Sequence, residues 1–234
     1  MLPALLLSAS VLALGVSAQS TCAPSHSAST GFRLVLNVTD LSLDLTPSVH
    51  GKYLSTAHIG PAQNRAIVSP DSNLSPIFYQ NGTFQDQLQF RAGILADTGS
   101  GLIEALQYLP LPEEDHPTQG HNRIFVSIGT PGAGTALTRL WTPVSYLTIL
   151  DGVVGSSFVV CNATIPYYGS QRVFQVVNWV AATRDSTGTH VKIPTGCAPV
   201  RLVPQCAFLP VVEGVGHEFV QEVRCYDDVG GVEW

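Results

Sequence analysis

The stretch of this sequence closest to a catalytic motif is GILADTGS, Gly93 to Ser100, in which Asp97 follows a run of aliphatic residues. Pepsin-like proteases present a catalytic carboxylate in this setting, but their chemistry needs two carboxylates that share one proton. The nearest second candidate, Asp151, is followed by glycine, and it lies too close along the chain to occupy the matching position of a second lobe. We therefore interpret the stretch as a glycine-rich turn in which Asp97 and Thr98 bond their own backbone.

Two other segments contain chemistry-bearing residues without completing a known site. Residues 129–135, GTPGAGT, have the glycine spacing of a phosphate-binding loop, but no lysine follows Gly134 to hold the phosphates. Residues 113–121 concentrate carboxylates and imidazoles, which can ligate a divalent metal. Pro112 and Pro117 instead favour an exposed, extended loop that binds no metal tightly. The acidic and imidazole side chains of this loop are Glu113, Glu114, Asp115, His116 and His121.

No segment supplies a recognisable nucleophile with its base. The Gly-x-Ser-x-Gly elbow and the His-Glu-x-x-His zinc motif are both absent from the sequence. A glycosidase would need two converging carboxylates, and the 17 acidic residues do not single out a pair. We expect no catalytic residue, no metal ligand and no cofactor, and a secreted hydrolase of carbohydrate or peptide is the alternative.

Composition restricts the possible partners. The chain has 234 residues, of which 45% are hydrophobic, so one domain can bury a substantial core. Only 12% of the residues are charged, and the formal net charge is −6 with 11 lysines and arginines. Nucleic acids and anionic membranes are bound by basic faces. We therefore expect neither as a partner.

The first 18 residues differ from the rest of the chain. Leu5 to Val16 is apolar but shorter than the roughly 20 residues that span a bilayer, and small residues at Val16 and Ala18 suit signal peptidase. The pattern predicts a secretory signal peptide over residues 1–18, although no basic residue precedes the apolar run. A buried N-terminal helix is the alternative. The C-terminal segment lacks the apolar end of a lipid-anchor signal, so we expect an extracellular protein.

Sequons and cysteines agree with export. Four N-x-[ST] sequons, more than chance provides, predict glycosylation at Asn37, Asn73, Asn81 and Asn162.

All five cysteines follow the expected cleavage point, and four of them should pair in an oxidising compartment. We favour Cys161–Cys197 and Cys206–Cys225, which leaves Cys22 as the odd thiol; pairing of Cys22 with another cysteine is the alternative.

Alternating hydrophobicity predicts an all-β fold. In FRLVLNVTD, the apolar residues Phe32, Leu34, Leu36 and Val38 fall on one face, which is the period-two pattern of a half-buried strand. About ten such short runs, separated by glycine and proline clusters, argue for an antiparallel β-sandwich or partly closed barrel with short strands and little helix.

Two segments need separate interpretation. PIFYQNGTFQDQLQF, residues 76–90, is expected to form a hairpin, because Asn81-Gly82 suits a tight turn between alternating arms. GLIEALQYL, residues 101–109, fits a strand and a nine-residue helix equally well.

The sequence predicts four regions along the chain. A signal peptide covers residues 1–18 and a disordered lead-in, rich in Ser, Thr and Ala, covers residues 19–31. A β-rich domain covers residues 32–204. Residues 205–234 form a small appendage closed by Cys206–Cys225, since thirty residues cannot build much of a core.

The order of several motifs resembles that of an uncharacterised family of small secreted fungal proteins, which is classified as a domain of unknown function. The matching motifs are FRLVLNV, HIGPAQNRAIV, FYQNGT, GSSFVVCN, RVFQVVNW and PTGCAPVRLVP, spread over residues 31–204. The resemblance implies a β-rich secreted domain with a disulfide between Cys161 and Cys197, and it implies no activity. In the family the histidine stretch carries a second glycine where Ala62 stands, and an acidic residue is common where Arg65 stands.

His58 and Asn64, in that histidine stretch, are weak candidates for a ligand-binding loop. Such residues more often tie a loop to its sheet through hydrogen bonds to the backbone. The leading interpretation of the chain is a secreted, non-catalytic binding or effector-like module. Its expected partner is an unidentified extracellular surface or a small apolar ligand.

Overall fold

The computed structural model describes residues 26–88, 93–97, 104–109, 121–128, 135–137, 147–149, 157–180, 182–211 and 217–230. The expected signal peptide, Cys22 and Asp151 lie outside these ranges, as do the phosphate-like loop up to Gly134 and residues 113–120 of the acidic loop.

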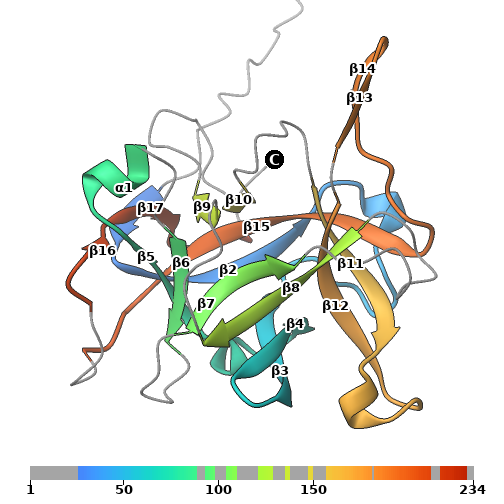
Figure 1. The fold of residues 1–234 in the computed structure, drawn as a ribbon, viewed down its shortest axis with the longest axis horizontal. Coiled ribbons are helices and arrows are strands. Elements are labelled where there is room, and N and C mark those ends of the chain that lie inside the picture. Colours follow the sequence, from blue (N-terminus) through green and yellow to red (C-terminus); the bar gives the residue numbers. More distant parts are fainter. Residues whose placement is uncertain are drawn as a thin grey trace, which may run out of the picture.

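The regular secondary structure of the described chain is almost entirely β-strand (Figure 1). The strands are β1 (His26–Ser29), β2 (Gly31–Val38), β3 (Tyr53–Gly60), β4 (Gln63–Ser69), β5 (Ile77–Asn81), β6 (Gly93–Asp97), β7 (Glu104–Leu109), β8 (His121–Ile128), β9 (Thr135–Leu137), β10 (Leu147–Ile149), β11 (Ser157–Thr164), β12 (Val173–Val180), β13 (Thr183–Asp185), β14 (Gly188–His190), β15 (Cys197–Ala207), β16 (Val220–Gln221) and β17 (Val223–Tyr226). The α-helix α1 covers Phe84–Leu88, and short 3-10 helices cover Leu41–Leu43, Ser72–Leu74 and Pro166–Tyr168. No helix in the described ranges is long and apolar enough to cross a membrane.

Six of these strands close into an antiparallel barrel. The ring runs β2–β3–β4–β12–β11–β15 and returns to β2, because β15 pairs with β2 from Val200 opposite Val38 to Ala207 opposite Gly31. The prediction of an all-β fold with a partly closed barrel and little helix is therefore confirmed.

A second group of strands is joined to this barrel at two forks. β2 pairs with β3 near Val35 and with β5 at Phe32, so β3 and β5 separate along one strand. From β5 the sheet continues through β6 and β7 to β8. β8 then pairs with the first part of β4 and the last part of β12, and it occupies the space where those two strands separate.

The core lies on the face that the alternation predicted. Phe32, Leu34, Leu36 and Val38 are all at most 4% exposed and belong to one apolar cluster. Burying side chains of this size contributes about 1.5–3 kcal/mol each, so this face of β2 fixes its register in the barrel.

The close approach of β2 to the end of β15 requires a glycine. A Cβ atom on Gly31 would lie 2.9 Å from the carbonyl oxygen of Ala207 and from Leu209, closer than real side chains come. Only glycine fits at this point without moving the backbone.

The terminal regions are more ordered than the sequence suggested. His26–Ser29 form β1, which pairs with β17, so the expected disordered lead-in is wrong for these residues. Antiparallel pairing with the edge of β17 orders these residues. β15 also continues through residue 204 to Ala207, and β17 pairs with it at Gln205. The C-terminal segment is closed by Cys206–Cys225 as expected, and its strand joins the main sheet.

The expected hairpin at residues 76–90 is wrong. Its first arm is β5, but the chain then enters α1 (Figure 1). Thr83 and Asp86 form a capping box, in which the Asp86 carboxylate accepts from the Thr83 N–H at 2.8 Å and the Thr83 hydroxyl accepts from the Asp86 N–H at 3.1 Å. The cap outweighs the turn preference of Asn81-Gly82. Residues 104–109, which fitted either class, form strand β7.

Candidate functional site

The histidine stretch forms the hairpin of β3 and β4. His58 lies opposite Asn64 in the strand register, and a bulge follows before Gly60. At the tip, Ala62 has a φ of 59°, and it is the one residue other than glycine with a positive φ in the described ranges. Glycine adopts this conformation without strain, so a glycine would fit this position better than Ala62.

Two polar residues of this hairpin point into the fold. The Nδ2 of Asn64 donates to Oε2 of Glu104 on β7 at 2.9 Å, and Glu104 is only 6% exposed. The guanidinium of Arg65, also 6% exposed, donates to the Val177 carbonyl at 3.0 Å and to Asn178 Oδ1. The change to arginine at this position therefore serves the packing of β4 against β12.

Of the two ligand-loop candidates, His58 and Asn64, only His58 is exposed. Its ring meets the ring of Tyr167 edge-on, with centroids 5.5 Å apart and an interplanar angle of 89°. Tyr167 belongs to the 3-10 turn between β11 and β12. The fold thus brings together two hairpin ends that are far apart in the sequence.

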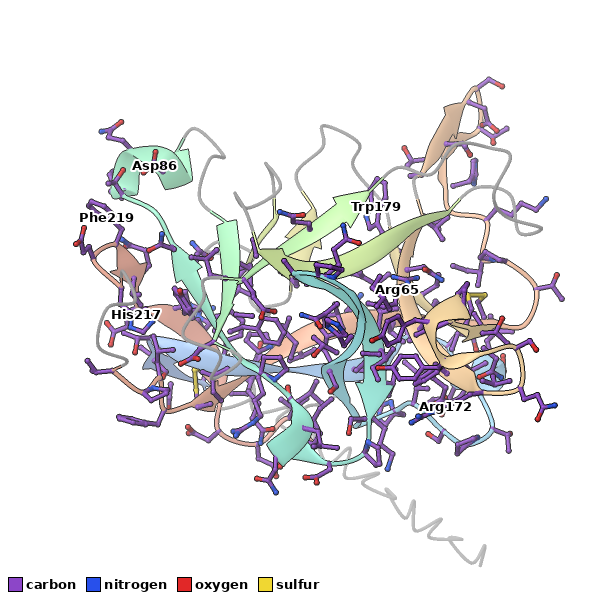
Figure 2. The ribbon with its side chains drawn as sticks, turned by 60° about the horizontal axis from the view of Figure 1, so that its bottom comes forward. Arg65, Asp86, Arg172, Trp179, His217 and Phe219 are labelled. Atoms are coloured by element: carbon purple, nitrogen blue, oxygen red, sulfur yellow. A yellow bond between two sulfur atoms is a disulfide. The ribbon has the colours of Figure 1, made fainter. Side chains whose placement is uncertain are left out.

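Three further side chains extend this contact. Tyr167 meets Tyr168 at 5.3 Å and 72°, and Tyr168 meets Phe174 at 5.0 Å. The Arg172 guanidinium lies over both of these rings, 5.2 Å from the Tyr168 centroid and 4.7 Å from that of Phe174. Figure 2 shows Arg172 on the β11–β12 side of the molecule, away from His217 and Phe219. We call the set His58, Tyr167, Tyr168, Arg172 and Phe174 the aromatic surface.

Tyr167 is the side chain of this surface that is open to a partner. It is 59% exposed, whereas Tyr168 and Phe174 are half-buried against Ala57, Ile165 and Val176. Its contacts with both the His58 ring and the Tyr168 ring limit the movement of its ring. The surface carries no nucleophile with a base, and its chemistry is that of stacking and hydrogen bonding.

Sequence reasoning did not identify Tyr167, Tyr168 or Arg172. The run PYYGSQR contains a proline, two tyrosines and a glycine in a turn, which was a usable indication of aromatic rings at a loop. The contact between these rings and His58 depends on how β3 and β4 lie beside β12. Local sequence patterns do not predict this tertiary arrangement.

Asp97 does not lie in a turn, as the sequence suggested, but ends strand β6 opposite Ile77. Its surroundings are those of a packed sheet. On the same face, Tyr79 is 1% exposed, and burial together with the charge of Asp97 raises the pKa of Tyr79 to about 12. The His217 ring lies against Tyr79 at a centroid distance of 4.9 Å.

The two favoured disulfides are present. Cys161 and Cys197 face each other across β11 and β15 with their Cα atoms 4.4 Å apart, and Cys206 and Cys225 join β15 to β17 with Cα atoms 5.1 Å apart.

The four sequon asparagines differ in exposure. Asn73 and Asn162 are exposed, whereas Asn81 is half-buried where β5 pairs with β16. Asn37, one residue before the end of β2, is 5% exposed. A glycan on Asn37 cannot be accommodated in the folded barrel, so the expectation for this position conflicts with the structure.

Comparison with known proteins agrees with the motif resemblance. Residues 29–206 match the family model described as Domain of unknown function (DUF7907). "Antigenic protein SchS34" of Stachybotrys chartarum is 31% identical over 215 residues, which cover 90% of this chain and 92% of the relative. No solved structure matches the chain. The matched range confirms the resemblance that the motifs indicated for residues 31–204.

Proposed function

We propose that this chain, which belongs to the family described as Domain of unknown function (DUF7907), is an exported, non-catalytic protein. Its proposed function is to bind uncharged polysaccharide through the aromatic surface. The observation that carries this proposal is Tyr167, an exposed ring held between two other rings. A side chain that is ordered before binding loses little entropy on binding.

The chemistry of the aromatic surface fits a pyranose. One face of such a sugar is lined by C–H bonds and packs on an aromatic ring, while its hydroxyls need polar neighbours. The Tyr167 hydroxyl and the His58 imidazole supply donors and acceptors beside the ring. An acidic polymer is disfavoured, because the chain carries a net charge of −6 and the Arg172 cation already lies over two rings.

Export and glycosylation are part of the same proposal. Two disulfides support a location where thiols are oxidised. Exposed sequons at Asn73 and Asn162 support glycan addition during export. The extracellular protein would then meet wall polysaccharide as its partner.

Sedimentation with insoluble chitin and with β-1,3-glucan tests the binding. The wild-type protein should sediment with at least one polymer, and Tyr167→Ala should weaken that binding about tenfold, since burying a large apolar side chain contributes about 1.5–3 kcal/mol. Tyr167→Phe should retain most of it. Val173→Ala, at a neighbouring residue that is 61% exposed but not aromatic, is the matched control.

Three results would count against the proposal. Sedimentation with neither polymer would exclude polysaccharide as the partner, and equal losses in Tyr167→Ala and Val173→Ala would exclude the ring. Release of soluble sugar from either polymer would favour the alternative, a secreted hydrolase.

A further inference from the structure

A cavity of about 340 Å³ opens on the outer side of the barrel and shares no residue with the aromatic surface. It is bounded by β2, the start of β3, β15 and the segment after β17. Val35, Leu36 and Asn37 of β2 line it. Val35 and Asn37 alternate along the strand with Leu34, Leu36 and Val38, which belong to the main core cluster. The cavity therefore lies outside the packed core.

Part of the wall of this cavity is apolar. Val35, Tyr53 and Val229 line it, and they belong to one packed cluster. Gly51 also lines it, and a Cβ atom placed on Gly51 would meet no heavy atom within 4 Å. A concave apolar wall of this size, near the lower end of the roughly 300–1,000 Å³ range of ligand sites, suits a small molecule.

Four polar side chains, those of Asn37, His50, Gln205 and Asp228, line the cavity, and the Gln205 Nε2 donates to the Asp227 carbonyl at 3.4 Å. Asn37 is 5% exposed, and its Oδ1 has no hydrogen-bond partner among the described residues. The Nδ1 of His50 accepts the Val38 N–H at 3.2 Å, so the neutral ring carries its hydrogen on Nε2. Asp228 is exposed, and its Oδ1 accepts the Gly230 N–H at 2.8 Å.

Charge selects the class of ligand. Among the lining residues Asp228 is the one carboxylate, and none is a lysine or an arginine. An anion would meet an acidic side chain in a protein whose net charge is −6. The exposed Asp228 carboxylate is an acceptor, and it favours a ligand that donates hydrogen bonds.

We propose that this cavity binds a small apolar amine, with the ammonium group toward Asp228 and the apolar body against Val35, Tyr53 and Val229. The Tyr53 ring favours an aromatic body. This site is independent of the polysaccharide proposal, because no residue is common to both.

The test is a titration of the full secreted chain, followed by protein NMR, with three probes of similar shape. The probes are 2-phenylethylamine, the neutral 2-phenylethanol and the anionic 3-phenylpropionate. The amine should bind up to about fivefold more tightly than the alcohol, the upper value for an exposed ion pair, and the anion should bind most weakly. Shifts should centre on Val35, Tyr53 and Val229.

Asp228→Asn isolates the charge. Asparagine keeps an Oδ1 acceptor for the Gly230 N–H, so the segment should hold its place, and the amine and the alcohol should then bind within about twofold of each other. Asp227→Asn is the matched control, because Asp227 does not line the cavity and its Oδ2 instead accepts from the Ser27 hydroxyl.

Three outcomes would overturn the proposal. The first is no shift with 2-phenylethylamine in the wild-type protein, and the second is binding of 3-phenylpropionate as tight as that of the amine. The third is an equal effect of Asp227→Asn and Asp228→Asn on the amine. None of these results depends on polysaccharide binding.

Discussion

Arg65 of β4 and Asn178 of β12 are joined by a hydrogen bond at the point where their two strands separate to admit β8. Both residues are buried, at 6% and 4% exposed. The same guanidinium also holds the Val177 carbonyl. One cationic side chain therefore ties the barrel together where continuous strand pairing between β4 and β12 stops.

Arg65→Met should destabilise the protein strongly. The substitution keeps much of the side-chain volume but leaves the Asn178 Oδ1 and the Val177 carbonyl without this donor, and each buried orphan costs about 1–3 kcal/mol. We expect a loss of about 2–4 kcal/mol in the free energy of unfolding, measured by urea denaturation. Arg201→Met, on the exposed side of β15, is the control and should cost at most about 1 kcal/mol. Similar losses in both variants would contradict the role of Arg65 in joining β4 to β12.

Ala62→Gly should stabilise the protein. A non-glycine residue in the left-handed region costs about 1–2 kcal/mol, while glycine adds roughly 0.5–1 kcal/mol of unfolded-state entropy. A net gain of up to about 1 kcal/mol should appear as a higher Tm. Ala163→Gly, in the extended strand β11, should lower the Tm, and a fall in both variants would show that Ala62 is not strained.

Tyr79→Phe should be neutral or stabilising. The Tyr79 hydroxyl is buried without a hydrogen-bond partner among the described residues, and removing such a group relieves a desolvation cost of about 1 kcal/mol or more. Tyr226 is equally buried but does have an interaction partner, so Tyr226→Phe should lose about 1 kcal/mol. Chemical denaturation of the two variants compares them directly.

The raised pKa of Tyr79 also sets a response to alkali. Its folded-state pKa of about 12 lies above the ordinary value of 10. The ionisation of Tyr79 therefore leaves the free energy of unfolding unchanged below pH 10 and lowers it as the pH rises from about 10 to 12. Tyr79→Phe should flatten the fall in stability across this window. An unchanged slope in the variant would mean that Tyr79 ionises at its ordinary pH.

Asp44 should make the loop before β3 sensitive to acid. Burial raises its pKa, but hydrogen bonds outweigh burial and the pKa lies below its ordinary value. The donors are the Ser48 hydroxyl at 2.6 Å and the N–H groups of Leu45 and Val49 at 2.8 and 3.0 Å.

A lowered folded-state pKa gives stability that is present above the unfolded value of about 3.9 and disappears as the pH falls through the folded value. Asp44→Asn should therefore cost about 1 kcal/mol at pH 7, and the difference from wild type should shrink as the pH falls through the lowered pKa of Asp44. Denaturation measured at several pH values checks this, with Glu222→Gln, an exposed carboxylate, as the control. A difference between wild type and Asp44→Asn that does not change with pH would rule out the charge as the cause.

Glycan occupancy should follow exposure rather than sequence. Asn73→Gln and Asn162→Gln should each remove one glycan from the secreted protein, because both asparagines are exposed. Asn37→Gln should leave the glycan mass unchanged and lower stability, since it enlarges a side chain that is 5% exposed. Intact-mass spectrometry before and after glycan removal distinguishes these outcomes, and a glycan on Asn37 would contradict the position of β2.

Local patterns predicted the strands well because burial on a sheet alternates with period two. Phe32 to Val38 is the plainest case. The exceptions arose where two local rules competed: Asn81-Gly82 suggested a turn, yet the Thr83–Asp86 cap starts a helix directly after it. The insertion of β8 between β4 and β12 depends on tertiary pairing, which leaves no local trace in the sequence.

The candidate site was only partly predictable for the same reason. His58 was identified from its loop, but its ring partner Tyr167 lies on a distant hairpin. Asn64, its companion in the prediction, turns inward to Glu104. A motif shows which residues are close in sequence, whereas the binding surface is formed by residues that only the barrel brings together.

The two disulfides share one strand: Cys197 is the first residue of β15 and Cys206 lies one residue before its end. As long as both disulfides are oxidised, this strand cannot separate from its neighbours at either end and offer its edge to a second molecule. Reduction removes both restraints, so we expect the reduced protein to aggregate while the disulfide-bonded form stays dispersed.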